Sequence, residues 1–87
     1  MGTEIVMNKI NECDVALNNV RAIFKGDSYL NSRIDYIYKG IEETRYNVEH
    51  VDELTGTDRD KYLELVFMVC HDLQKNINNL LLKLLIS

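Results

Sequence analysis

Apolar residues recur at alternating steps of three and four along most of the chain, the spacing that places side chains on one face of an α-helix. The clearest such run comprises Leu63, Val66, Cys70, Leu73, Ile77, Leu80 and Leu84. A run near the start of the chain comprises Val6, Ile10, Cys13, Leu17, Val20 and Phe24. The run between them comprises Leu30, Ile34, Ile37, Ile41, Thr44, Val48 and Val51. We call each run a seam, and the seams predict helices over about residues 3–24, 28–54 and 57–86.

The breaks between the seams contain glycine, and the chain of 87 residues has no proline. Gly26 is suited to the left-handed conformation that closes many helices, and Asp27 or Ser28 can cap the helix that follows. Gly56 separates the second seam from the third. Short connections place consecutive helices antiparallel. We therefore predict one all-α domain over residues 1–87, an elongated antiparallel three-helix bundle. A variant is a helical hairpin with a semi-detached first helix that pairs with another chain.

The last predicted helix carries more apolar residues than one seam uses. Those outside the seam are Tyr62, Leu65, Phe67, Met68, Val69, Leu81, Leu82, Leu85 and Ile86. Such a helix is either central to the core or presents an interface to another chain. Tyr29 and Tyr36 lie one heptad apart outside the second seam, and tyrosine is enriched at interfaces. The expected partner-binding residues on these two helices are Tyr29, Tyr36, Leu65, Val69, Leu82 and Leu85.

The charge of the chain argues against nucleic-acid binding. The formal net charge is −4, and the basic residues are spread from Lys9 to Lys83 without a cluster. A nucleic-acid binder needs a concentrated basic surface that displaces counterions from phosphates. We therefore expect no nucleic-acid partner.

The histidines do not fit a metal or catalytic site. Metal sites in helical bundles commonly use a Glu and a His three residues apart on one helix. At that spacing His50 is preceded by Asn47 and His71 by Met68. No glycine-rich phosphate loop or Cys-x-x-Cys motif is present. The sequence therefore predicts a non-enzymatic protein without cofactor or metal.

The cysteines, Cys13 and Cys70, both fall on apolar seams. A free thiol in that position behaves as a small hydrophobic side chain. Cys70 and His71 are neighbours in the chain, so their side chains point about 100° apart on a helix and do not form a catalytic pair. We interpret the cysteines as buried structural thiols, favoured over disulfide or redox use, in a reducing compartment.

Neither end of the chain has the features of a membrane segment. The opening Met-Gly-Thr-Glu-Ile lacks the basic region and apolar stretch of a Sec-type signal. The leucine-rich residues 80–86 are too short to span a bilayer and are interrupted by Lys83. We expect a soluble cytoplasmic protein without a membrane span.

The connection Phe24-Lys25-Gly26-Asp27-Ser28 resembles the Trp-x-Gly turn of the WXG superfamily, small helical hairpins associated with type VII secretion in Gram-positive bacteria. Phe24 stands where that family has tryptophan, and Gly26 where it has glycine. The opening Thr-Glu-Ile-Val and the Val-Ala-Leu run at residues 15–17 are similar to the WXG-like partners of LXG toxins. The family's C-terminal Tyr-x-x-x-Asp/Glu signal has no counterpart, since Tyr62 is followed at that spacing by Val66.

The resemblance implies that the protein pairs with another helical chain, in a homo- or hetero-oligomer, and that the composite is recognised for secretion without a Sec-type signal. It adds Phe24 and Gly26 to the expected partner-binding residues. The favoured hypothesis is a non-enzymatic helical adaptor of this kind. The alternative is a small acidic immunity or antitoxin-type inhibitor. Its contact residues would be the acidic side chains around Gly56, namely Asp52, Glu53, Asp58 and Asp60.

Overall fold

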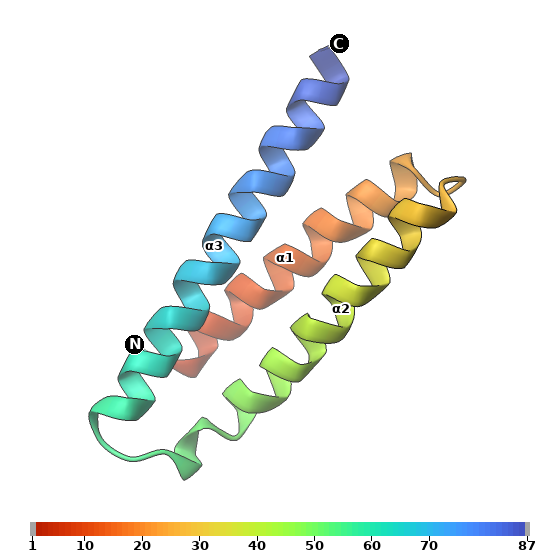
Figure 1. Cartoon of the computed structure of the whole chain (residues 1–87). Helices are drawn as coiled ribbons and strands as arrows, with labels where there is room; N and C mark the ends of the chain where they lie inside the picture. The colour runs from red at the N-terminus through yellow and green to blue at the C-terminus, as the bar shows by residue number, and fades with distance from the viewer. Residues whose placement is uncertain (1, 87) are drawn as a thin grey trace.

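The computed structural model describes residues 2–86, apart from the side chain of Leu84. Helix α1 covers Thr3–Ile23, α2 covers Ser28–Glu49, a short 3-10 turn η1 covers Val51–Glu53, and α3 covers Thr57–Ile86. Helix α2 runs antiparallel to α1 and α3, and α1 lies between the other two (Figure 1). The described part measures 47 × 23 × 15 Å, which confirms the predicted elongated all-α bundle.

The core is built from the predicted seams. Its buried residues are Val6, Ile10, Cys13, Ala16, Leu17 and Val20 of α1, Ile34, Ile41 and Val48 of α2, Val51 of η1, and Leu63, Val66, Cys70 and Ile77 of α3. Helix α1 supplies the largest share because it packs against both other helices. The first helix is therefore central to the bundle, and the variant with a semi-detached first helix is wrong.

The second helix is shorter than predicted. It ends at Glu49, where the His50 N–H donates to the carbonyl oxygen of Tyr46, and the chain then forms η1. The tighter turn keeps Val51 buried in the core, whereas Asp52, Glu53 and Leu54 are exposed. Helices in proteins are stabilised mainly by packing an apolar face. With little to bury after Val51, the packing that would extend the helix to Leu54 is missing.

The turn between α1 and α2 is held by backbone hydrogen bonds. The Phe24 N–H donates to Val20 at 3.0 Å, and the Asp27 N–H donates to Phe24 at 2.9 Å. Asp27 caps α2 as predicted, because its Oδ1 accepts from the Leu30 N–H at 3.0 Å. Gly26 is not left-handed, so that prediction is wrong. Within the described residues, positive φ occurs only at Gly56, at 59°.

The C-terminal part of α3 extends beyond the rest of the bundle (Figure 1). Helix α3 has 30 residues and α1 has 21, a difference of roughly 14 Å at 1.5 Å per residue. Leu80, predicted as a seam residue, is 51% exposed, and its neighbour Leu81 packs against the core instead. Leu84, the last predicted seam residue, has its side chain outside the described part. The third seam thus functions as core only as far as Ile77.

Candidate partner-binding groove

Helices α2 and α3 hardly touch each other, although each packs against α1. When three helices pack as a triangle, every pair is in contact, so this bundle is open on one side. The open side contains an apolar groove of about 370 Å³. We call it the α2–α3 groove. Its lining comprises Ile10 of α1, Ile37, Gly40, Ile41 and Thr44 of α2, and Tyr62, Leu65, Val66, Val69, Cys70 and Leu73 of α3.

The groove combines a buried base with an exposed wall. Ile10 and Val66 are buried and belong to the core. Leu65 and Val69 are 59% and 57% exposed, and they form part of the wall contributed by α3. Their spacing of four residues places them one turn apart on the same face. Apolar surface of this kind favours binding, because its removal from water is stabilising.

On the α2 side, the groove lining includes a residue without a side chain, Gly40. A Cβ atom at Gly40 would meet nothing within 4 Å, so no close helix approach within the chain explains this glycine. The hydroxyl of Thr44 donates to the carbonyl oxygen of Gly40 at 2.8 Å. Its donor is therefore satisfied within α2. Thr44, the one polar residue of the second seam, and Gly40, which precedes seam residue Ile41, both line the α2–α3 groove.

Among the groove residues not predicted as partner-binding, three are apolar and only half-buried. Ile37 and Leu73 are seam residues, and Tyr62 lies beside the third seam; all three are half-buried and pack against the core. The periodic spacing shows which helix face carries Ile37 and Leu73, but it does not show how deeply that face is buried. The sequence feature that could have indicated a groove is the presence of Gly40 and Thr44 one helical turn apart on α2, where they leave the apolar face incompletely filled.

The predicted partner-binding residues on the helices separate into two groups. Leu65 and Val69 lie in the groove. Tyr36 is 76% exposed on α2 and does not line the groove. Leu82 and Leu85 are 57% and 77% exposed on the last turns of α3 and do not line the groove.

The remaining predicted positions lie at the α1–α2 end of the bundle. Phe24 is half-buried and packs against the core. Gly26 is exposed in the turn, and Tyr29 is 74% exposed in the first turn of α2. The structure thus places Leu65 and Val69 in one groove and leaves the other predicted residues apart from it.

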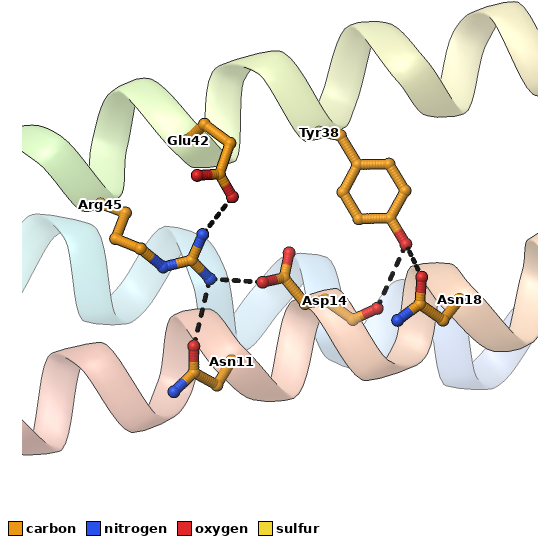
Figure 2. A network of polar contacts seen from close by, with 6 residues as sticks. All are labelled: Asn11, Asp14, Asn18, Tyr38, Glu42 and Arg45. Atoms are coloured by element: carbon orange, nitrogen blue, oxygen red, sulfur yellow. Dashed lines mark hydrogen bonds and ion pairs between the residues drawn. The ribbon is translucent and has the colours of Figure 1, made fainter.

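A polar network joins α1 to α2 outside the groove (Figure 2). The guanidinium of Arg45 pairs with Asp14 of α1 and with Glu42 of its own helix, and it donates to the Asn11 side chain at 3.1 Å. The hydroxyl of Tyr38 donates to the Asn18 side chain, as Figure 2 shows, and lies 3.4 Å from the Asp14 carbonyl oxygen. These contacts fix the register of α2 on α1 and leave the groove lining apolar.

The α1–α3 contact is supported by one long side chain. The Lys9 ammonium group donates to the Gln74 side chain at 3.1 Å and pairs with Glu12 at 2.7 Å. It also lies 5.5 Å from the centre of the Phe67 ring, within cation–π range. The ammonium group of Lys9 holds the pKa of the Glu12 carboxyl below its usual value. This cluster supports the packing of α3 on α1.

The negative charge of the acidic turn around Gly56 is partly offset by the guanidinium group of Arg59. Arg59 Nε lies 3.2 Å from a carboxylate oxygen of Asp52, and its Nη1 lies 3.6 Å from one of Asp60. Glu53 and Asp58 are exposed. Within the described part of the chain, no ion pair is formed by these two carboxylates.

Residues 2–86 contain no group of three or more His, Cys, Asp or Glu side chains placed to hold a metal ion. Over the same residues, no helix combines the length and apolar character needed to cross a membrane. In comparisons with known proteins, no family model, curated protein or solved structure matches the chain. The arrangement of the helices and the groove between α2 and α3 define the class of the protein: an open, all-α three-helix bundle with an apolar groove.

Proposed function

We propose that the protein is a non-enzymatic helical interaction module whose α2–α3 groove binds an amphipathic α-helix of another protein chain. The observation that carries this proposal is the open arrangement of the bundle, in which α2 and α3 pack on α1 but not on each other. In a four-helix bundle the helices pack around a shared core, and a helix contacts its two adjacent neighbours more extensively than the helix diagonal to it. Helices α2, α1 and α3 correspond to three of these helices, and the groove lies where the fourth would pack.

The chemistry of the groove suits a helix of this kind. Binding of an amphipathic helix depends on apolar anchors spaced three, four and seven residues apart that enter an apolar groove. Leu65, Val69 and Leu73 offer matching positions along α3, and Gly40 leaves room for the partner to approach α2 closely. The groove has no exposed charged residue in its lining, so the helix face that enters it should be uncharged.

The finer form of the proposal is a targeting adaptor resembling the WXG-like partners of type VII secreted toxins. It is supported by the Phe24-x-Gly26 turn, in which Phe24 packs against the core and the Asp27 N–H closes the turn. The bound helix would then belong to the N-terminal helical region of a larger secreted protein. Recovery of the complex from culture medium of the source cells tests this form separately from the groove.

An inhibitor of the immunity or antitoxin type is the second candidate. Its supporting observation is the exposure of Asp52, Glu53, Asp58 and Asp60 at one end of the bundle. Arg59 offsets two of these charges, so Glu53 and Asp58 would be the principal contacts. Reversing both charges, Glu53→Lys with Asp58→Lys, should abolish binding to a toxin and leave binding in the groove unchanged.

The test combines partner identification with a pair of matched variants. Tagged protein is expressed at native level in its source cells, the co-purifying chain is identified, and its affinity for the purified protein is measured. Gly40→Leu adds a bulky side chain to the groove lining at a position where a Cβ atom meets nothing within 4 Å, so we expect an unchanged or higher melting temperature and a loss of affinity of more than tenfold. Lys39→Leu adds the same side chain at an exposed position of α2 outside the groove and should bind as the wild type does.

Two results would contradict the proposal. One is equal affinity of Gly40→Leu and Lys39→Leu for the partner, which would place the interface elsewhere. The other is a protein that is recovered alone and monomeric at native concentration.

A further inference from the structure

We propose that Cys13 and Cys70 form a dithiol–disulfide site, in which Cys70 reacts first with a small-molecule disulfide entering from the α2–α3 groove and Cys13 then closes an intramolecular disulfide. This inference is independent of the proposed partner. The sequence pattern alone predicts that Cys13 and Cys70 are buried structural thiols. The structure agrees that both cysteines are buried and free, but it also places them against each other.

The two cysteines meet where α1 packs on α3. The thiol of Cys13 donates to the backbone oxygen of Cys70 at 3.0 Å. Its sulfur is therefore in contact with the residue that carries the other thiol. Disulfides need the two Cα atoms within about 7 Å and the side chains directed at each other. Seam positions on two tightly packed helices are suited to that requirement.

Access to the two sulfurs differs, and the difference sets the order of reaction. Cys70 lines the α2–α3 groove and is 7% exposed, whereas Cys13 is 0% exposed and does not line the groove. A reagent arriving from solvent therefore meets Cys70 first. Interaction with the neighbouring Cys13 side chain also lowers the pKa of Cys70 to about 7, and the pKa of Cys13 is raised by the same interaction and by burial. Because the thiolate is the attacking species, reactivity and access both favour Cys70.

The chemistry balances with a small-molecule disulfide, RSSR, as oxidant. The Cys70 thiolate attacks one sulfur of RSSR, which forms a mixed disulfide on Cys70 and releases one RS⁻. The Cys13 thiol gives its proton to the released RS⁻, its sulfur attacks the Cys70 sulfur, and a second RS⁻ leaves and takes a proton from solvent. Two protein thiols are thereby oxidised to one disulfide, and RSSR is reduced to two thiols.

The product would connect the two most extensively packed helices covalently. Cys13 and Cys70 are separated by 57 positions in the chain, so the bond closes a long loop. Long-loop disulfides stabilise by restricting the unfolded chain. We expect the melting temperature of the oxidised protein to exceed that of the reduced protein by roughly 10 °C or more.

The experiment uses the purified full chain and oxidised glutathione. After incubation with glutathione disulfide and quenching with acid, peptide mapping by mass spectrometry should show the peptide containing Cys13 linked to the peptide containing Cys70, in monomeric protein. Cys13→Ser should stop at a stable glutathione adduct on Cys70. Cys70→Ser should leave Cys13 unmodified over the same time, because its thiol is shielded.

Competitive labelling of the reduced wild-type protein covers the case in which a variant fails to fold. With limiting alkylating reagent under native conditions, Cys70 should be modified at least tenfold faster than Cys13. The proposal is wrong if the wild-type protein remains reduced in glutathione disulfide, if disulfides form only between molecules, or if the two thiols are alkylated at equal rates.

Discussion

Arg45 of α2 and Asp14 of α1 form an ion pair across two antiparallel helices, with side chains only 18% and 25% exposed. The same guanidinium contacts Glu42 and Asn11, as Figure 2 shows. Burial alone would lower the pKa of Arg45, but the hydrogen bonds and charge interactions with Asp14 and Glu42 together outweigh it, and the pKa is raised. A partly buried cation with three polar partners is more constrained than an ordinary surface ion pair.

Replacement of Arg45 by alanine should therefore destabilise the bundle. It would leave the Asp14 carboxylate half-buried without its cation, and we expect the free energy of unfolding to fall by about 1–2 kcal/mol. Arg33→Ala, at an exposed position of the same helix, should change it by less than about 0.5 kcal/mol. Urea unfolding followed by circular dichroism measures both. Equal effects of the two substitutions would show that the network contributes only surface charge.

The seams predicted most of the core because apolar residues at this spacing lie on one face of a helix, and that face packs against the other helices. Val6, Ile10 and Cys13 of α1 and Leu63 of α3 are all fully buried as expected. The pattern failed near the end of α3. Leu80 has the spacing of a core residue, but it is 51% exposed and the neighbouring Leu81 packs against the core.

The groove was harder to predict because it depends on how helices pair. Short connections suggested that α2 and α3 would pack together, yet the two helices meet α1 instead. Periodicity assigns residues to a face of one helix and does not say which helix that face meets. Leu65 and Val69 were recognised because they exceed the needs of a seam, whereas Ile37 was assigned to the core and is only half-buried. The Cys13–Cys70 contact could not be predicted either, because the periodicity of one helix does not show which residue of another helix it meets.

A core substitution in α3 should have a large effect on stability. Leu63 is fully buried, and its truncation in Leu63→Ala removes buried methyl groups and leaves a cavity. We expect a loss of about 2–5 kcal/mol in the free energy of unfolding. Leu82→Ala makes the same change where the side chain is 57% exposed and should cost less than about 0.5 kcal/mol. Chemical denaturation of the two variants checks this, and a large effect of Leu82→Ala would mean that the end of α3 is covered in solution.

Gly40 and Gly56 should respond to replacement by alanine in opposite directions. Gly40 lies inside α2 with open space around its Cα, so Gly40→Ala should raise the free energy of unfolding by about 0.5–1 kcal/mol. Gly56 has a φ of +59°, which costs roughly 1–2 kcal/mol for a residue with a Cβ. Gly56→Ala should accordingly destabilise. Thermal unfolding of both variants distinguishes them, and stabilisation by Gly56→Ala would mean that the turn adopts another conformation.

Tyr38 should make the stability of the bundle depend on alkaline pH. Burial raises the pKa of its phenol above the usual value of 10.0, because the charged form is poorly solvated there. Arg21 opposes this shift, and Asp14 and Asp35 add smaller contributions to it. Below pH 10 the phenol is neutral in both the folded and the unfolded chain, and its contribution to stability is fully present. As the pH rises from about 10 through the higher folded-state pKa, the unfolded chain loses the proton first, so the free energy of unfolding falls.

Tyr38→Phe removes this ionisation together with the hydrogen bonds to Asn18 and Asp14. At pH 7 the variant should be less stable by about 1 kcal/mol, and its stability should fall less steeply above pH 10 than that of the wild type. Tyr36→Phe removes an exposed phenol from the same helix and is the matched control. Urea unfolding at a series of pH values from 7 to 11 measures both slopes. If Tyr38→Phe and the wild type lose stability in parallel above pH 10, the phenol of Tyr38 is not held neutral by its position between α1 and α2.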